Sequence, residues 1–131
     1  MPRAASVSPP EGRARTLPRL RHRRDFLLLS GSRIKVVTTA FVLQARARSD
    51  GGAGGVGFTA SRRVGGAVAR NRARRRLKAL AAKVLAPRAR AGWDYALVAR
   101  TEAVTHPWPA LIADLETALD RLERRADGAT P

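Results

Sequence analysis

The chain contains no cysteine and few aromatic residues. Of its 131 residues, two are Trp, one is Tyr and three are Phe. Without Cys, neither a disulfide framework nor a thiolate metal site is available, which fits a reducing compartment. No stretch approaches the roughly 18 consecutive apolar residues that a membrane helix needs. We therefore expect no membrane span, a cytoplasmic location and one small domain with a hydrophobic core.

Acidic residues are also scarce. The 10 Asp and Glu residues face 26 Lys and Arg residues, which gives a formal net charge of +16. A small domain with this charge repels itself unless counterions or a polyanionic partner screen it. A net charge of about 2 to 8 already suffices for solubility. Nucleic acid is therefore the expected partner, whereas a membrane surface is disfavoured because the basic segment lacks anchoring Trp or Phe.

The patterns along the chain predict one domain between two short tails. Residues 1–18 mix Pro, Ser, Ala and Arg without periodicity and predict a disordered basic tail, followed by a domain over 19–125 and a second tail over 126–131. We expect helices over Leu20–Ser30 and Pro109–Arg125, and strands over Arg33–Val37, Ala40–Ala47, Val56–Ser61 and Trp93–Ala99. Asp25, Asp50 and Asp94 are interpreted as cap or turn residues.

A basic helix is expected between the third and fourth strands. The segment Arg62–Lys78 carries eight Lys or Arg residues and no acid. At helical spacing, an apolar stripe can pack on a sheet, and the basic residues then fall into separate rows on the outer side. The stripe comprises Ala69, Ala73, Leu77, Leu80 and Val84, one row comprises Arg70, Arg74 and Lys78, and Arg72, Arg75 and Arg76 cover the back and the opposite edge. Like charges at this spacing oppose helix formation by about 0.2 to 0.5 kcal/mol per pair, which bound phosphates would offset.

The stretch TASRRVGGAVARNRARRRLK, residues 59–78, resembles the signature of the bacterial ribonuclease P protein subunit. The resemblance extends to RRDF at 23–26, FVL at 41–43 and WDYALVAR at 93–100. It implies an α/β two-layer sandwich with the order α-β-β-β-α-β-α, ribosomal protein S5 domain 2-like. It also implies a left-handed βαβ crossover, although the general rule favours right-handed connections.

The same resemblance implies a function in tRNA maturation. The protein subunit would bind the catalytic RNA and the 5′ leader of precursor tRNA as a monomer in a 1:1 ribonucleoprotein. The RNA and its Mg²⁺ would cleave the leader, with no active site or metal site in the protein. The residues implied to bind RNA are Arg62, Arg63, Arg70, Asn71, Arg72, Arg74, Arg75 and Lys78.

A cleft for the single-stranded leader is implied at Phe26, Ser30, Val42 and Gln44. Many family members carry aromatic residues where this chain has Ser30 and Gln44, so we expect less base stacking and more phosphate contact. For Phe26, a core role and direct stacking are both open. Phe41 and Phe58 are expected in the core.

Other functions are less well supported by the sequence. His22 and His106 have no carboxylate at ligand spacing and are expected on the surface, which disfavours independent nuclease chemistry. A DNA-binding helix-turn-helix is disfavoured because strand patterns flank the basic helix. A general RNA-binding or ribosomal-type protein without a role in tRNA processing remains the alternative.

Overall fold

The expected order of helices and strands is confirmed. The computed structural model describes residues 18–20, 23–31, 34–48 and 54–128. These residues form helices α1 (Arg23–Ser30), α2 (Ala67–Leu80) and α3 (Trp108–Gly128), and strands β2 (Lys35–Val37), β3 (Phe41–Ala47), β4 (Val56–Thr59) and β5 (Trp93–Ala99). Short turns η1 (Arg62–Val64) and η3 (Thr101–Val104) and a π-helical turn η2 (Ala81–Leu85) join them. None of the helices in this part of the chain is both long and apolar enough to cross a membrane.

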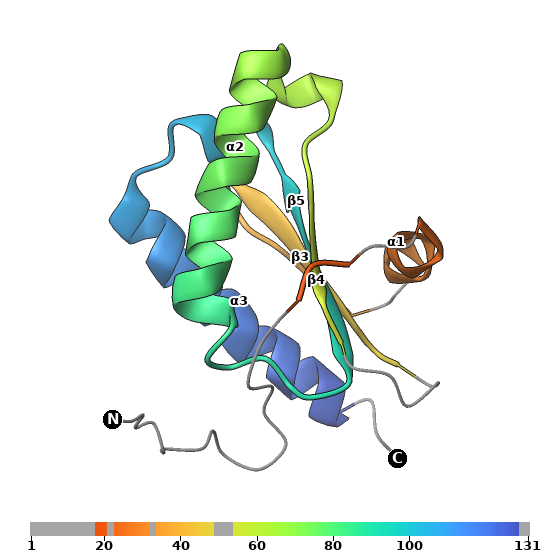
Figure 1. Ribbon diagram of the computed structural model, residues 1–131. Helices are drawn as coiled ribbons and strands as arrows, with labels where there is room; N and C mark the ends of the chain where they lie inside the picture. The colour runs from red at the N-terminus through yellow and green to blue at the C-terminus, as the bar shows by residue number, and fades with distance from the viewer. Residues whose placement is uncertain (1–17, 21–22, 32–33, 49–53, 129–131) are drawn as a thin grey trace, which may run out of the picture.

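The four strands form one mixed sheet in the order β2-β3-β5-β4. The pairs β2–β3 and β3–β5 are antiparallel, whereas β4 and β5 are parallel and are joined through α2. In Figure 1, α2 lies in front of the sheet and the upper end of β5 lies to the left of β4, so the crossover is left-handed. The handedness that the resemblance implied is therefore present.

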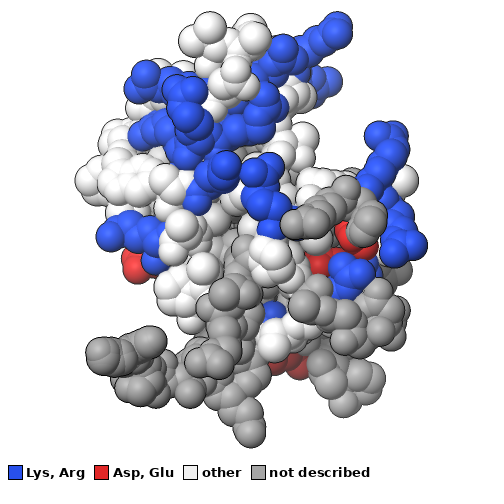
Figure 2. Space-filling view, in the orientation of Figure 1, with Lys and Arg blue, Asp and Glu red and all other residues white. Residues whose placement is uncertain are grey.

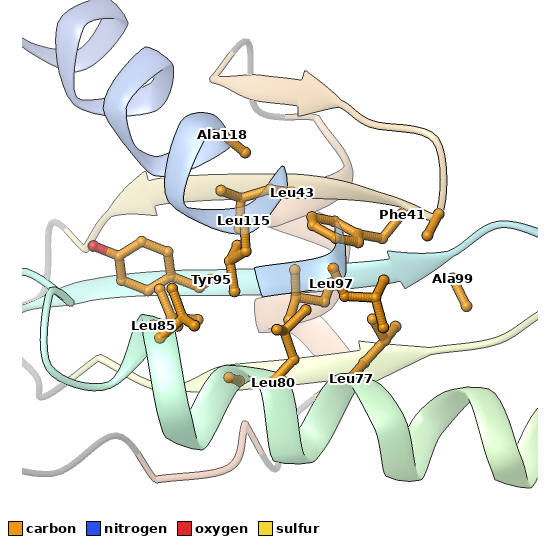
Figure 3. Close-up of a cluster of buried hydrophobic side chains, with 14 of the residues drawn as sticks. Phe41, Leu43, Leu77, Leu80, Leu85, Tyr95, Leu97, Ala99, Leu115 and Ala118 are labelled. Carbon is orange, nitrogen blue, oxygen red and sulfur yellow. The ribbon is translucent and has the colours of Figure 1, made fainter. Parts of the chain in front are cut away.

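The main core lies between the sheet and the helices α2 and α3. Alternation along β5 points Tyr95 and Leu97 to this side, where Leu77 and Leu80 of α2 pack against the sheet (Figure 3). Each fully buried Leu contributes about 1.5 to 3 kcal/mol. Phe41 is fully buried in this core, as expected. The apolar stripe of the basic helix is thus what fixes its orientation on the sheet.

The opposite face of the sheet carries α1 (Figure 1). The register aligns Lys35, Gln44, Ala96 and Gly57 in one row across the four strands on this face. The next row is aliphatic apart from one threonine and consists of Val37, Val42, Val98 and Thr59. Leu29 of α1 is fully buried, whereas Leu27 and Leu28 are more than half exposed.

Several predicted boundaries were wrong by a few residues. The first helix begins at Arg23 because Leu20 instead extends along β4, where its N–H donates to the Val56 carbonyl. The third strand ends at Thr59 because the Ser61 hydroxyl accepts from the Arg63 N–H and caps η1. The last helix runs from Trp108 to Gly128 with Ala126 buried, whereas it was predicted to end at Arg125. The predicted N-terminal tail lies outside the described residues up to position 17.

Candidate nucleic-acid interface

Basic side chains gather over α2. Figure 2 shows Lys and Arg concentrated on the upper part of the face that α2 covers, with little acidic surface beside them. The outer side of α2 supplies most of them, because its inner side is occupied by the apolar stripe. A dense group of basic side chains on this face is therefore presented by one helix.

One hollow collects several of the predicted RNA-binding residues. It has a volume of about 260 Å³ and is lined by Arg19, Phe58, Asn71, Arg74, Arg75 and Lys78. We call it the α2 hollow. A smaller hollow of about 140 Å³ shares Arg19, Phe58 and Lys78 and continues between β4 and η2. The α2 hollow thus joins residues from α2, β4 and the segment before α1.

The lining of the α2 hollow combines cations with an aromatic ring. The Arg19 guanidinium lies 5.6 Å from the centroid of the Phe58 ring. Arg74 donates to the Asn71 Oδ1 at 2.7 Å, which holds the two side chains together at the edge. Guanidinium groups bind phosphate oxygens in a planar fork, and aromatic faces stack with bases. Phe58, expected as a core residue, is half-buried and available to this hollow.

Arg72 and Arg76 point to the other side of α2. Arg76 donates to the carbonyls of Ala103 at 2.8 Å and His106 at 2.6 Å, and Arg72 Nε donates to the carbonyl of Val104 at 3.2 Å. Burial lowers the pKa of Arg76, and the nearby charge of Arg72 lowers it further. The structure therefore does not bring Arg72, a predicted RNA ligand, into the α2 hollow. Both arginines fasten α2 to the turn after β5.

The remaining predicted arginines lie near the start of α2. Arg62 and Arg63 are exposed in η1. Arg70 is half-buried, and its Nε is buried without a hydrogen-bond partner among the described residues. Arg62 and Arg63 are therefore the more accessible of the three arginines to a ligand.

Three of the four residues predicted for the leader cleft lie on the α1 side of the sheet. Val42 and Gln44 are half-buried on β3, and the ring of Phe26 lies against Gly57 of β4. A Cβ at Gly57 would stand 2.2 Å from the Phe26 Cε1, so only glycine permits this contact. The side chain of Ser30 lies outside the described part. We call this surface, formed by Phe26, Val37, Val42, Gln44 and Val98, the α1-side face.

A buried ionic cluster lies beside the α1-side face and was missed by the sequence analysis. Asp94 is fully buried in β5, and its Oδ2 lies 3.1 Å from both Arg46 and Arg48. The Asp25 Oδ1 lies 3.5 Å from Arg46 and 3.4 Å from Arg48. The interpretation of Asp25 and Asp94 as cap or turn residues was therefore wrong, and Asp50 lies outside the described residues. A carboxylate inside the apolar strand WDYALVA was the signal that could have revealed the cluster.

The acidic residues of α3 mostly engage basic residues of the protein. His106 Nε2 lies 3.1 Å from Asp114 Oδ2, so the expectation of no carboxylate near this histidine was wrong. Burial alone would lower the pKa of Arg88, but Asp120 and Glu123 outweigh burial and raise it. Within the described ranges, no three His, Asp or Glu side chains gather as a metal site. His22 lies outside them.

Comparison with known proteins decides the family. The family model described as Ribonuclease P matches residues 15–123. The chain belongs to the ribonuclease P protein family. Family members are protein components of a tRNA-processing ribonucleoprotein endonuclease, so the partnership of this chain with RNA follows from its membership.

Individual relatives agree with this family. The chain is 43% identical over 125 residues to the ribonuclease P protein component of Ruegeria pomeroyi, covering 93% of this chain and 96% of the relative. It is 41% identical over 113 residues to the ribonuclease P protein component of Paramagnetospirillum magneticum, covering 83% of this chain and 85% of the relative. The solved protein of Staphylococcus aureus aligns with a TM-score of 0.61 at 20% identity, covering 78% of this chain and 92% of that one. The solved protein of Thermotoga maritima aligns with a TM-score of 0.59 at 24% identity, covering 81% of this chain and 96% of that one. These structures support the fold.

Proposed function

We propose that this chain binds the catalytic RNA of ribonuclease P through the α2 hollow and holds the 5′ leader of precursor tRNA on the α1-side face. The observation that carries the proposal is the shared hollow of Asn71, Arg74, Arg75 and Lys78, which contains Phe58 as its aromatic wall. One protein monomer would bind one RNA subunit. The leader would be removed to give the mature 5′ end of tRNA.

The charges around the α2 hollow favour RNA over a neutral ligand. Four of its six lining residues are Lys or Arg and none is acidic. Neutralising phosphates with such groups releases counterions, which supplies much of the affinity of proteins for nucleic acid. Half-buried Arg70, one helical turn before Arg74, extends this row of basic residues along α2. Exposed Arg62 and Arg63 in η1 continue it past the helix start.

The α1-side face suits single-stranded RNA. Gln44 and Gly57 belong to one row and are two strands apart, which corresponds to about 10 Å. The ring of Phe26 lies at one end of this row, and Val42 lies in the neighbouring row. An unpaired nucleotide can contact a ring and an aliphatic surface through its base, whereas a stacked duplex cannot.

Cleavage itself is assigned to the RNA. As the family resemblance implies, the Mg²⁺ used in cleavage would be held mainly by RNA phosphates. When bound there, Mg²⁺ supplies the activated water and stabilises the leaving oxygen. The side chains of this chain bind and orient RNA, and no protein group is given a step in bond breaking.

Reconstitution tests the proposal. Adding the chain to its cognate catalytic RNA should restore cleavage of precursor tRNA at a low Mg²⁺ concentration. The double variant Arg74→Ala/Lys78→Ala should lose this stimulation. Arg121→Ala/Arg124→Ala removes the same charge from exposed positions of α3 and serves as the matched control. RNA binding without stimulation by the wild-type chain would favour the alternative, a general RNA-binding protein.

A further inference from the structure

The helix α1 is attached to the sheet by a cluster of four charges, of which the two carboxylates are buried and the two guanidiniums are partly buried. Asp25 on α1 faces Arg46 and Arg48, which also bind Asp94 near the start of β5. Asp94 Oδ1 additionally accepts the Gly55 N–H at 3.2 Å. The two carboxylates and two guanidiniums balance in charge, and the side chains of Asp25 and Asp94 are 5% and 0% exposed. Such a cluster tolerates little displacement, because a separated partner would leave a buried charge uncompensated.

Only part of the apolar surface of α1 packs on the sheet. Of its three consecutive leucines, only Leu29 is fully buried, whereas Leu27 is 58% and Leu28 is 53% exposed. An aliphatic contact by itself permits sliding, since the hydrophobic effect has no direction. Ion pairs between partly and fully buried groups resist such sliding, because a displaced partner would leave a charge uncompensated. The ion pairs of Asp25 with Arg46 and Arg48 therefore help to fix the position of α1 along the sheet.

Phe26 follows Asp25 directly in the sequence. Its Cε1 and Cζ approach Gly57 so closely that a Cβ there would lie 2.2 Å and 2.4 Å away. We propose that Asp25 is a positioning residue, which holds the Phe26 ring over Gly57 through the ionic cluster and thereby makes the ring available to a base of the 5′ leader. The inference rests on the proposed function of the α1-side face, and it assigns to Asp25 a role in leader binding without contact to RNA.

The position of the ring can be measured without RNA. Gly57 Hα lies beside the Cε1–Cζ edge of the Phe26 ring and should show a ring-current shift in the NMR spectrum of the free protein. The isosteric variant Asp25→Asn should reduce this shift. The variant Gly57→Ala should displace the ring sterically while leaving all four charges in place. Asp120→Asn is the matched control, because it is the same substitution at an exposed position of α3, and it should preserve the Gly57 shift.

The consequence for leader binding is measured in the reconstituted holoenzyme. The quantity is the ratio of affinities for precursor tRNA with a leader and for tRNA without one. Asp25→Asn, Gly57→Ala and Phe26→Ala should each lower this ratio by about fivefold or more, as expected for one lost base stack. Affinity for leaderless tRNA should be unchanged. Combining Asp25→Asn with Phe26→Ala should add nothing further, because both changes remove the same contact.

Two results would overturn the inference. One is an unchanged Gly57 shift in Asp25→Asn, and the other is a changed shift with an unchanged leader ratio. If Asp25→Asn does not fold, Asp25→Asn/Arg46→Gln removes one charge of each sign and leaves the Asp94–Arg48 pair balanced, with the same two results expected. If the wild-type chain fails to stimulate cleavage, the proposed function fails, whereas the Gly57 shift still reports whether Asp25 positions Phe26.

Discussion

The guanidinium of Arg76 donates to the main-chain carbonyl of His106 at 2.6 Å, and its other terminal nitrogen donates to Ala103 at 2.8 Å. These bonds fasten α2 to the segment between β5 and α3. The arginine is therefore part of the scaffold, although it belongs to the most basic stretch of the chain. Its neighbour Arg75 is exposed and lines the α2 hollow instead.

Replacing Arg76 with Ala should lower the free energy of unfolding by about 1.5 to 3 kcal/mol, because charged hydrogen bonds to carbonyls are lost. Arg75→Ala removes the same charge and should change stability by less than about 0.5 kcal/mol. Urea denaturation followed by circular dichroism measures both values. Equal effects of the two substitutions would show that net charge, and not the bonds to the turn, governs stability here.

Asp94 is predicted to be the most sensitive acidic residue. Asp94→Asn should destabilise the fold by about 3 to 5 kcal/mol, because Arg46 and Arg48 would keep their charges in a buried site with only Asp25 opposite. Asp120→Asn should cost less than about 1 kcal/mol, since Asp120 is 57% exposed and its ion pair with Arg88 is solvated. The measurement is the midpoint temperature of thermal unfolding of the two variants at the same ionic strength. Similar midpoints would contradict a large contribution of the ionic cluster to stability.

The layers of this fold were largely predictable from periodicity. The stripe containing Leu77 and Leu80 placed α2 on the sheet, because 3.6-residue spacing leaves one apolar side. Strand β5 was predicted at its observed bounds, Trp93–Ala99. The left-handed crossover was available only through family resemblance, since local sequence preferences carry no information on the hand of a connection and the general rule gives the opposite result.

The ionic cluster was not predicted, for a physical reason. Asp25 and Asp94 meet only because α1 folds onto β3 and β5, and a pairing between distant segments leaves no periodic pattern. Arg46 and Arg48 are two residues apart, and the alternation of side chains along a strand predicts that they lie on the same face of the sheet. The separation of Arg72 from the hollow was equally hidden, because it depends on where η3 lies.

RNA affinity should depend on salt through the α2 hollow. Arg74→Ala and Lys78→Ala should each reduce the slope of log affinity against log salt for catalytic RNA by about 0.7 to 0.9, which is the release of roughly one counterion. Arg76→Ala should leave the slope unchanged, since its guanidinium binds carbonyls of the protein. Filter binding at four salt concentrations provides the slopes. Identical slopes for all three variants would mean that RNA docks elsewhere.

The α1-side face should gain leader affinity from an added aromatic ring. Gln44 is half-buried on β3, in the same row as the Gly57 that Phe26 covers. Gln44→Tyr should therefore strengthen the leader-dependent part of precursor tRNA binding by about 1 to 3 kcal/mol, the value of one stacked base. The measurement is the affinity ratio with and without a leader.

Gln44→Leu is the control for the same position, because leucine adds apolar surface without a ring. A gain with Tyr and none with Leu is expected if a base stacks there. Equal gains would mean that aliphatic contact suffices, as the neighbouring row of Val37, Val42 and Val98 already offers such a surface. No gain with either residue would mean that the leader does not contact position 44 of β3.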